Sequence, residues 1–236
     1  MPGKPSLASS ERGSDDYPKL SHAPAISAAF TPCDNPRVTT TARTSRPIPL
    51  ATFLVFAGLI GFVAAFALTL EKFAGLVSPG EAASCDFSVL VQCTKNLESA
   101  QGSTFGFPNP LIGLAGFTAV IAVGVGVLAG ARFARWFWAL FNLGLLAALA
   151  FVVYLISTSI YYLGTLCPWC MVVWSVTIPA FIAVTLHNVK AGVIPLPGRL
   201  RRALGEAYAW TPFLTLLCYI VVALLAQLRL DVIRYL

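Results

Sequence analysis

Residues 165–187 read TLCPWCMVVWSVTIPAFIAVTLH. A Cys-x-x-Cys pair, Cys167 and Cys170, opens an apolar run of about the 20 residues needed to cross a bilayer. Such a pair can close a disulfide or contribute half of a metal site. Because the pair lies where one very hydrophobic segment ends and the next begins, its chemistry belongs at a membrane.

The composition of the whole chain also indicates a membrane protein. Of its 236 residues, 57% are hydrophobic and 11% are charged, and the mean hydropathy is +0.77. Soluble domains carry about a quarter charged residues, so this chain has too little charge to cover a soluble surface. The net charge of +6 comes from residues scattered through short loops and a tail, which argues against a nucleic-acid partner.

Five apolar runs of spanning length predict five transmembrane helices, because a backbone surrounded by lipid must satisfy its own hydrogen bonds. The expected fold class is therefore an all-α integral membrane protein, with a four-helix transmembrane bundle core plus a fifth transmembrane helix. The runs cover residues 48–70, 110–131, 136–162, 167–187 and 211–228.

The domain organisation follows from these runs. Residues 1–47 are rich in Ser, Pro and Thr, and this composition predicts a disordered cytoplasmic tail. Residues 48–187 form the expected core, with a polar loop at 71–108 that is external to the membrane. Residues 188–210 are expected to be a basic cytoplasmic loop, and residues 211–236 the fifth helix with a short external tail. Cys33 in the tail and Cys218 in the fifth helix are expected to be inert thiols.

The positive-inside rule predicts the orientation in a cell inner membrane. Lys and Arg gather on one side of the five spans, and that side is expected to be cytoplasmic, together with the amino terminus. The residues on this side are Arg43, Arg46, Arg132, Arg135, Lys190, Arg199, Arg201 and Arg202. The loop that carries Cys85 and Cys93 then lies outside, and so does the turn before Cys167. All four paired cysteines are thus predicted to meet at the oxidising face.

The cysteines at this face favour redox chemistry. Cys167 and Cys170 begin a helix, where a thiolate is stabilised and its pKa falls. Cys85 and Cys93 lie in a polar loop that can swing between a soluble partner and the membrane pair. Two alternatives remain open at this point: a zinc ion held by the 2+2 cysteines, and two disulfides with a purely structural role.

Electrons that reach a pair embedded in the membrane need an acceptor. No flavin or haem motif is present in the sequence, so a lipid-soluble quinone is the simplest acceptor, and no metal is expected. Asn109 begins the second span and could bind the quinone, or it could cap the helix before Pro110. Trp174 lies four residues after Cys170 and could stack on the quinone ring, or simply pack against lipid.

Together these residues resemble the vitamin K epoxide reductase family. The shared features are a loop Cys pair with seven residues between, Ser99 six residues later, Asn109 at the start of the second span, and a later Cys-x-x-Cys. They cover about residues 48–187. The resemblance is closest to bacterial homologues, which oxidise a periplasmic thioredoxin-like protein and reduce a quinone.

The resemblance implies a role for each of these residues. Cys85 would exchange with the partner, Cys93 would pass electrons to Cys167, and Cys170 would lie next to the quinone. Asn109 would donate a hydrogen bond to a quinone carbonyl. Ser99 would be a loop residue at the active site.

The sequence departs from the family in three places. Nothing after Leu228 is expected to form the thioredoxin-like domain that many bacterial members carry, so a separate extracytoplasmic partner is expected. The fifth span is additional to the core. Trp174 stands where the vertebrate enzymes have a tyrosine, and it lacks the phenol hydroxyl.

The expected function is a membrane thiol oxidase that drives disulfide bond formation, with a quinone of the menaquinone or ubiquinone type as electron acceptor. One rival is a vitamin K epoxide or quinone reductase that uses the same cysteines. Another is a non-enzymatic transporter with structural disulfides. The span centres carry no Asp, Glu, Lys or Arg, which argues against transport.

Overall fold

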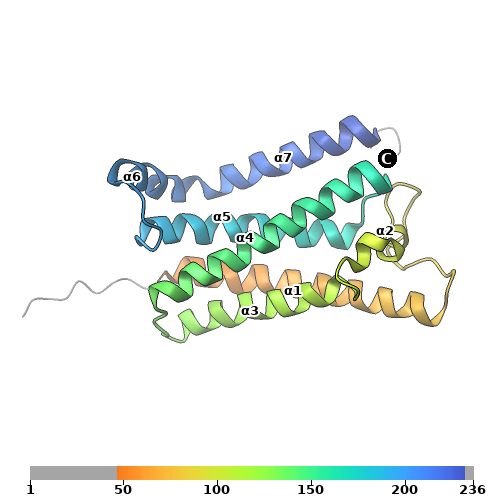
Figure 1. The fold of residues 1–236 in the computed structure, drawn as a ribbon, viewed down its shortest axis with the longest axis horizontal. Coiled ribbons are helices and arrows are strands. Elements are labelled where there is room, and N and C mark those ends of the chain that lie inside the picture. The colour runs from red at the N-terminus through yellow and green to blue at the C-terminus, as the bar shows by residue number, and fades with distance from the viewer. Residues whose placement is uncertain (1–46, 232–236) are drawn as a thin grey trace, which may run out of the picture. The chain divides into compact units, whose positions relative to one another are not determined.

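The computed structural model describes residues 47–231, and its secondary structure there is helical (Figure 1). Among these described residues, five helical stretches are long and apolar enough to cross a membrane, which confirms the predicted all-α membrane protein. Residues 1–46, including Cys33, and residues 232–236 lie outside the described residues. The elements are α1 Ile48–Val77, α2 Thr94–Glu98, η1 Ala100–Ser103, α3 Pro110–Leu128, α4 Arg135–Ser157, η2 Thr158–Leu163, α5 Pro168–Lys190, α6 Gly198–Glu206, η3 Ala207–Trp210 and α7 Thr211–Leu230.

The largest differences from the prediction lie at the end of α1 and in the segment 188–210. Helix α1 continues to Val77 rather than ending at Leu70, because Glu71 and Lys72 are good helix formers and the strong helix breaker Pro79 comes only after its end. The segment 188–210 was expected to be a loop, and this prediction was wrong. It contains the end of α5, the helix α6 and the turn η3.

Helices α1 and α3 pack closely because glycines leave room between them. A Cβ atom at Gly61 would overlap the ring of Phe117, and one at Gly58 would lie 2.7 Å from the side chain of Ile121. A Cβ at Gly124 would lie 2.8 Å from that of Val55. Small residues at such interfaces let helix backbones approach in lipid, where dispersion contacts drive association.

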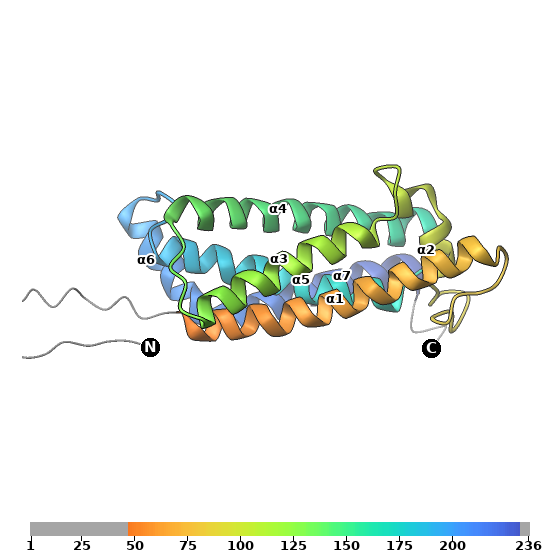
Figure 2. The same ribbon diagram turned by 90° about the horizontal axis from the view of Figure 1, so that it is seen from below.

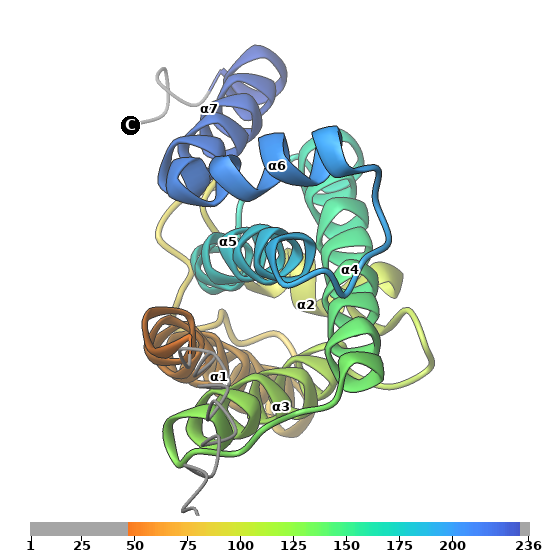
Figure 3. The same ribbon diagram turned by 90° about the vertical axis from the view of Figure 1, so that its left-hand side faces the viewer.

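Helix α5 occupies the middle of the bundle (Figure 3). It packs against α1 and α4 through a buried cluster that includes Leu54, Leu145 and Val184. Helix α7 packs on α5 and on η2, the π-helical end of α4, around Trp174, Ile160 and Ala226. The fifth helix is therefore added to one side of the four-helix core.

The two ends of the bundle carry different kinds of residues. At one end lie α2, the loop between α1 and α3, and the start of α5, which together carry both cysteine pairs (Figures 1 and 2). At the other end lie the α3–α4 connection and α6, with their arginines. The cysteine pairs therefore share the end opposite the arginine-rich connections, as the charge count predicted.

Candidate active site

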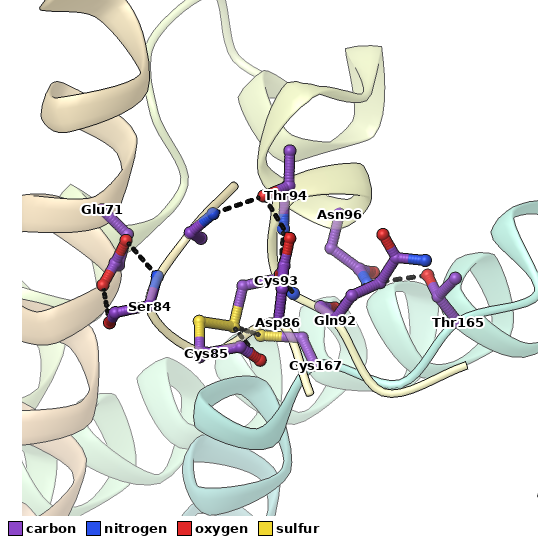
Figure 4. The surroundings of a disulfide bond; sticks show 11 residues. Glu71, Ser84, Cys85, Asp86, Gln92, Cys93, Thr94, Asn96, Thr165 and Cys167 are labelled. Atoms are coloured by element: carbon purple, nitrogen blue, oxygen red, sulfur yellow. Dashed lines mark hydrogen bonds between the residues drawn. A yellow bond between two sulfur atoms is a disulfide. The ribbon is translucent and has the colours of Figure 1, made fainter. Parts of the chain in front are cut away.

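A disulfide joins Cys85 and Cys93 in the connection between α1 and α3 (Figure 4). The two Cα atoms are 5.7 Å apart. Cys93 occupies the position just before α2, and it has no exposed surface, while Cys85 is 4% exposed. The loop pair is thus oxidised and turned inward.

The carboxylate of Asp86 holds the beginning of α2 in place. Its Oδ1 accepts hydrogen bonds from the backbone N–H groups of Cys93 at 2.6 Å and Thr94 at 3.1 Å. Its Oδ2 accepts one from the Thr94 hydroxyl at 2.6 Å. Burial alone would raise the pKa of Asp86, but these hydrogen bonds outweigh it and hold the pKa below its usual range. We name Asp86 and Thr94 the aspartate clamp.

The part of α1 beyond residue 70 also holds the loop. The carboxylate of Glu71 accepts hydrogen bonds from the backbone N–H and the hydroxyl of Ser84. Lys72 Nζ donates to the carbonyl of Leu97 at 2.6 Å. The extension of α1 past its predicted end therefore provides the polar groups that position the disulfide loop.

The second cysteine pair lies at the start of α5. Cys167 is extended, with φ −92° and ψ 121°, and Pro168 begins the helix. This suits proline, which has no N–H to lose at that position. Cys167 is fully buried, and its Sγ lies 3.2 Å from Sγ of Cys93 (Figure 4). Cys167 and Cys170 are not joined by a disulfide.

The surroundings of Cys167 favour its thiolate form. Its pKa is lowered, chiefly because the thiol of Cys170 donates a hydrogen bond to its sulfur. Burial acts in the opposite direction, while the backbone N–H groups of Cys170 and Trp169 lower the pKa further. The N–H groups at the start of α5 act in the direction that the sequence predicts, but the Cys170 hydrogen bond is the larger cause.

A short β-bridge brings the two cysteine segments into register. It pairs Val91 with Leu166; Leu166 donates to the carbonyl of Leu90 at 2.8 Å and accepts from the N–H of Gln92 at 3.1 Å. The turn before it needs a left-handed residue, which Gly164 provides with φ +66°. The bridge sets Cys93 opposite Cys167.

Side chains reinforce this bridge. Asn96 Nδ2 donates to the Thr165 hydroxyl at 2.9 Å, and Asn96 Oδ1 accepts from the Ser159 hydroxyl at 3.2 Å. Ser159 also donates to the carbonyl of Thr165. Both Thr165 and Ser159 are buried, so α2, η2 and the start of α5 are tied together beside the sulfur atoms.

Ser99 and Asn109 shape the loop that follows α2. The Ser99 hydroxyl donates to the carbonyl of Asn96 at 2.8 Å and accepts from the N–H of Gly102 at 3.0 Å, which caps η1. Asn109 precedes α3 but makes no side-chain cap. Its Nδ2 donates to the carbonyl of Gln101 at 2.6 Å, and its Oδ1 accepts from the N–H of Thr104 at 3.0 Å.

Trp174 is 6% exposed and lies in the cluster that Cys170 packs against. Packing against lipid, one of its two expected positions, does not describe it. It borders an apolar cavity of about 620 Å³ among α4, α5 and α7, together with Leu166, Met171 and Tyr219. The start of α5 and the indole of Trp174 therefore line the same apolar cavity.

Sequence reasoning missed the polar residues that hold the sulfurs together. They are Glu71, Asp86, Asn96, Ser159 and Thr165. Their contacts join segments far apart in the chain, and no motif spacing marks them. A weak signal existed for Asp86, because an acidic residue next to a loop cysteine can satisfy the open N–H groups at a helix start.

The chain has helices long enough to span a membrane, and its two cysteine pairs are in sulfur contact at one end of the bundle. These features are those of a membrane redox enzyme. The sequence assigns the family: residues 52–185, more than half of the chain, match the vitamin K epoxide reductase family, so the chain belongs to that family and is an oxidoreductase. A search of the curated proteins found no match for the chain.

Proposed function

We propose that this protein is a thiol oxidase of the cell inner membrane. Electrons would pass from a separate, reduced thioredoxin-like protein outside the cytoplasm to Cys85 and Cys93, then to Cys167 and Cys170, and finally to a membrane quinone. One observation carries the proposal: Sγ of the free Cys167 lies 3.2 Å from Sγ of Cys93, which is disulfide-bonded to Cys85. A disulfide sulfur offers no thiolate to zinc, so this pairing favours the redox alternative.

The transfer between the two pairs is a thiol–disulfide exchange. The Cys93 thiolate of a reduced loop attacks Sγ of Cys167 and breaks the Cys167–Cys170 bond. The electron pair of that bond stays on Cys170, which takes up a proton. The Cys85 thiolate then attacks Sγ of Cys93 and releases Cys167 as a thiolate. The loop pair loses two electrons and the α5 pair gains them. The products are a Cys85–Cys93 disulfide beside two free thiols, the state described above.

The environment of Cys167 favours this direction. A thiol of low pKa is a better leaving group in disulfide exchange, and the hydrogen bond from Cys170 and the N–H groups at the start of α5 lower the pKa of Cys167. The second attack, which expels Cys167, is thereby accelerated.

The exchange with the partner requires the loop to open. A partner thiolate would attack Cys85 and release Cys93, and the partner's second thiol would then release Cys85, so that the partner leaves oxidised. Cys85 is only 4% exposed in the closed loop. Phe87 and Val89, which are 74% and 85% exposed, offer an apolar contact beside it.

Quinones are the electron partners of this family, and a bound quinone would accept two electrons and two protons from the α5 pair. The apolar cavity beside Trp174 fits a hydrophobic ring and tail, and the indole could stack on the ring. Asn109 is the other predicted ligand. Because its amide is engaged by Gln101 and Thr104, it would have to release the loop to reach a quinone. Ser99 is proposed to act only through the loop.

Quinone reduction by purified protein tests the proposal. Cys170→Ala should abolish quinone reduction with either a small dithiol or a thioredoxin-like partner as donor. Cys93→Ala should keep the reaction with the small dithiol and lose the one with the protein. Cys218→Ala is the matched control, because Cys218 is a free thiol in α7 outside the relay. Undiminished quinone reduction by Cys170→Ala would overturn the proposal.

A parallel assay with vitamin K epoxide separates the alternative reaction within the family. We expect no epoxide reduction, because Trp174 has no hydroxyl to donate to the epoxide oxygen. Epoxide turnover that depends on Cys170 would favour the alternative.

A further inference from the structure

The end of the bundle opposite the cysteines has a basic cavity that the redox chemistry does not use. The cavity has a volume of about 710 Å³ and lies between the end of α5 and the helix α6. Lys190, Arg201 and Arg202 line it, against a single lining carboxylate, that of Glu206. In Figure 3, α6 runs from the near end of α7, alongside α5, toward α4.

The cations at this cavity lack carboxylate partners. Within residues 47–231, no ion pair is formed by Lys190, Arg201 or Arg202. Lys190 Nζ instead lies over the ring of Tyr208, 5.5 Å from its centre. A guanidinium of Arg201 and one of Arg135 both approach Gly192, at 3.4 and 3.6 Å from where its Cβ would stand. Positive charge from two separate connections therefore converges without being neutralised.

An apolar groove adjoins the basic cavity. It has a volume of about 600 Å³ and shares Tyr208 and Ala209 with the cavity. Its walls come from three helices, with Phe53 of α1, Pro179 of α5 and Leu216 of α7 among them. The two spaces together form one site with a cationic end and an apolar end that runs along membrane-spanning helices.

We infer that this site binds an anionic phospholipid, with the headgroup phosphate at Arg201, Arg202 and Lys190 and an acyl chain in the groove. Guanidinium groups bind phosphate oxygens through paired hydrogen bonds, and basic pockets beside membrane helices suit anionic headgroups. A free phosphate would leave the groove unused, and a neutral apolar molecule would leave the cations unused. The combination fits a lipid.

Binding can be measured on the full-length protein by thermal unfolding in detergent micelles. Micelles containing phosphatidylglycerol should raise Tm, because a ligand that binds only the folded state stabilises it. The same amount of phosphatidylcholine, or inorganic phosphate, should not. The double variant Arg201→Gln/Arg202→Gln should weaken phosphatidylglycerol binding about thirtyfold, from about 1 kcal/mol for each basic residue. Arg199→Gln is the matched control, because Arg199 is on α6 but does not line the cavity.

A second pair of variants tests the connection between the two spaces. Ala209→Trp should block the junction and reduce the Tm rise, whereas Ala203→Trp, an exposed position of α6 away from the lining, should leave it intact. Equal stabilisation by phosphatidylcholine would show that the charges are unused and would overturn the inference. Equal stabilisation by inorganic phosphate would show a simple anion site and would overturn it as well. A full Tm rise in the Arg201/Arg202 double variant would do the same.

Discussion

The side-chain amide of Asn96 donates a hydrogen bond to the hydroxyl of Thr165 across 2.9 Å, and this contact joins α2 to the segment just before Cys167. The two residues are 69 positions apart in the chain. Together with the Val91–Leu166 bridge, the contact determines which sulfur of the loop faces α5.

Replacing Asn96 by Ala should slow electron transfer between the two cysteine pairs. The variant loses hydrogen bonds to Thr165 and Ser159, and one such bond contributes about 1 kcal/mol, or about a fivefold change in the docked fraction. The measurement is the redox state of each pair, read by alkylation and mass spectrometry after rapid mixing with a reductant. Gln92→Ala is the control, because the Gln92 side chain bonds only within its own loop, to Val89. Equal rates in both variants would contradict a positioning role for Asn96.

The aspartate clamp should make loop closure insensitive to mild acid. The pKa of Asp86 is lower in the folded protein than in the unfolded chain, so its stabilisation is complete above the unfolded value of about 3.9. It is lost only as the pH falls through the lower folded value. Reduction of the Cys85–Cys93 disulfide by a membrane-impermeant phosphine should therefore stay slow from pH 7 to 5.

Asp86→Asn should accelerate that reduction at every pH in this range, because the amide cannot accept the same set of hydrogen bonds. Glu81→Gln, an exposed acidic position in the same loop, should behave like the unaltered protein. A steep rise in reduction rate between pH 7 and 5 in the unaltered protein would contradict the clamp.

The pKa of the Cys167 thiol should lie below the ordinary value for cysteine. The titration can be followed by thiolate ultraviolet absorbance in a chain in which Cys33 and Cys218 are replaced by Ala and the loop disulfide is intact. Adding Cys170→Ser should keep part of the shift, because a hydroxyl can still donate to the sulfur. Adding Cys170→Ala should raise the midpoint, because the main cause of the lowered pKa is the Cys170 hydrogen bond. A midpoint unaffected by Cys170→Ala would refute this assignment.

Gly61→Ala should destabilise the bundle. The new Cβ would overlap the ring of Phe117, and overpacking of this kind costs about 1–3 kcal/mol. Thermal unfolding in detergent is the measurement. Gly116→Ala on α3 is the control, because a Cβ there meets nothing within 4 Å, and a helical alanine is favoured over glycine by up to about 1 kcal/mol. Loss of stability in Gly116→Ala alone would disprove the packing argument.

Local signals in the sequence predicted much of this fold. Unbroken apolar runs predict helices in lipid regardless of tertiary context. The distribution of Lys and Arg among the connections predicted that both cysteine pairs lie at the same end of the bundle. The end of α1 and the helix α6 were missed because both lie outside the apolar runs, where charged residues are compatible with either helix or loop. The amphipathic pattern of α6 extends over only nine residues.

The candidate site was predictable to the extent that its chemistry is local. The Cys-x-x-Cys spacing identifies Cys167 and Cys170, and Pro168 predicts their position at the start of a helix. The 3.2 Å contact between Cys93 and Cys167 depends on a β-bridge and on Asn96, which are long-range contacts without a motif. Asn109 was selected for its position at the start of the second span, and this position does not predict its contacts with the loop. Its proposed contact with a quinone therefore stays a prediction.

The complete burial of Cys93 and Cys167 has a consequence for the fidelity of such a relay. Small thiols cannot reach the two inner sulfurs while the loop is closed, so in the proposed relay they would reduce the quinone only as often as the loop opens. A reductant reaches these sulfurs only when the loop that Glu71 and Asp86 hold has opened. In the proposed relay, the closed loop would favour substrates that bind it and open it, and the frequency of its opening would set the upper limit on turnover.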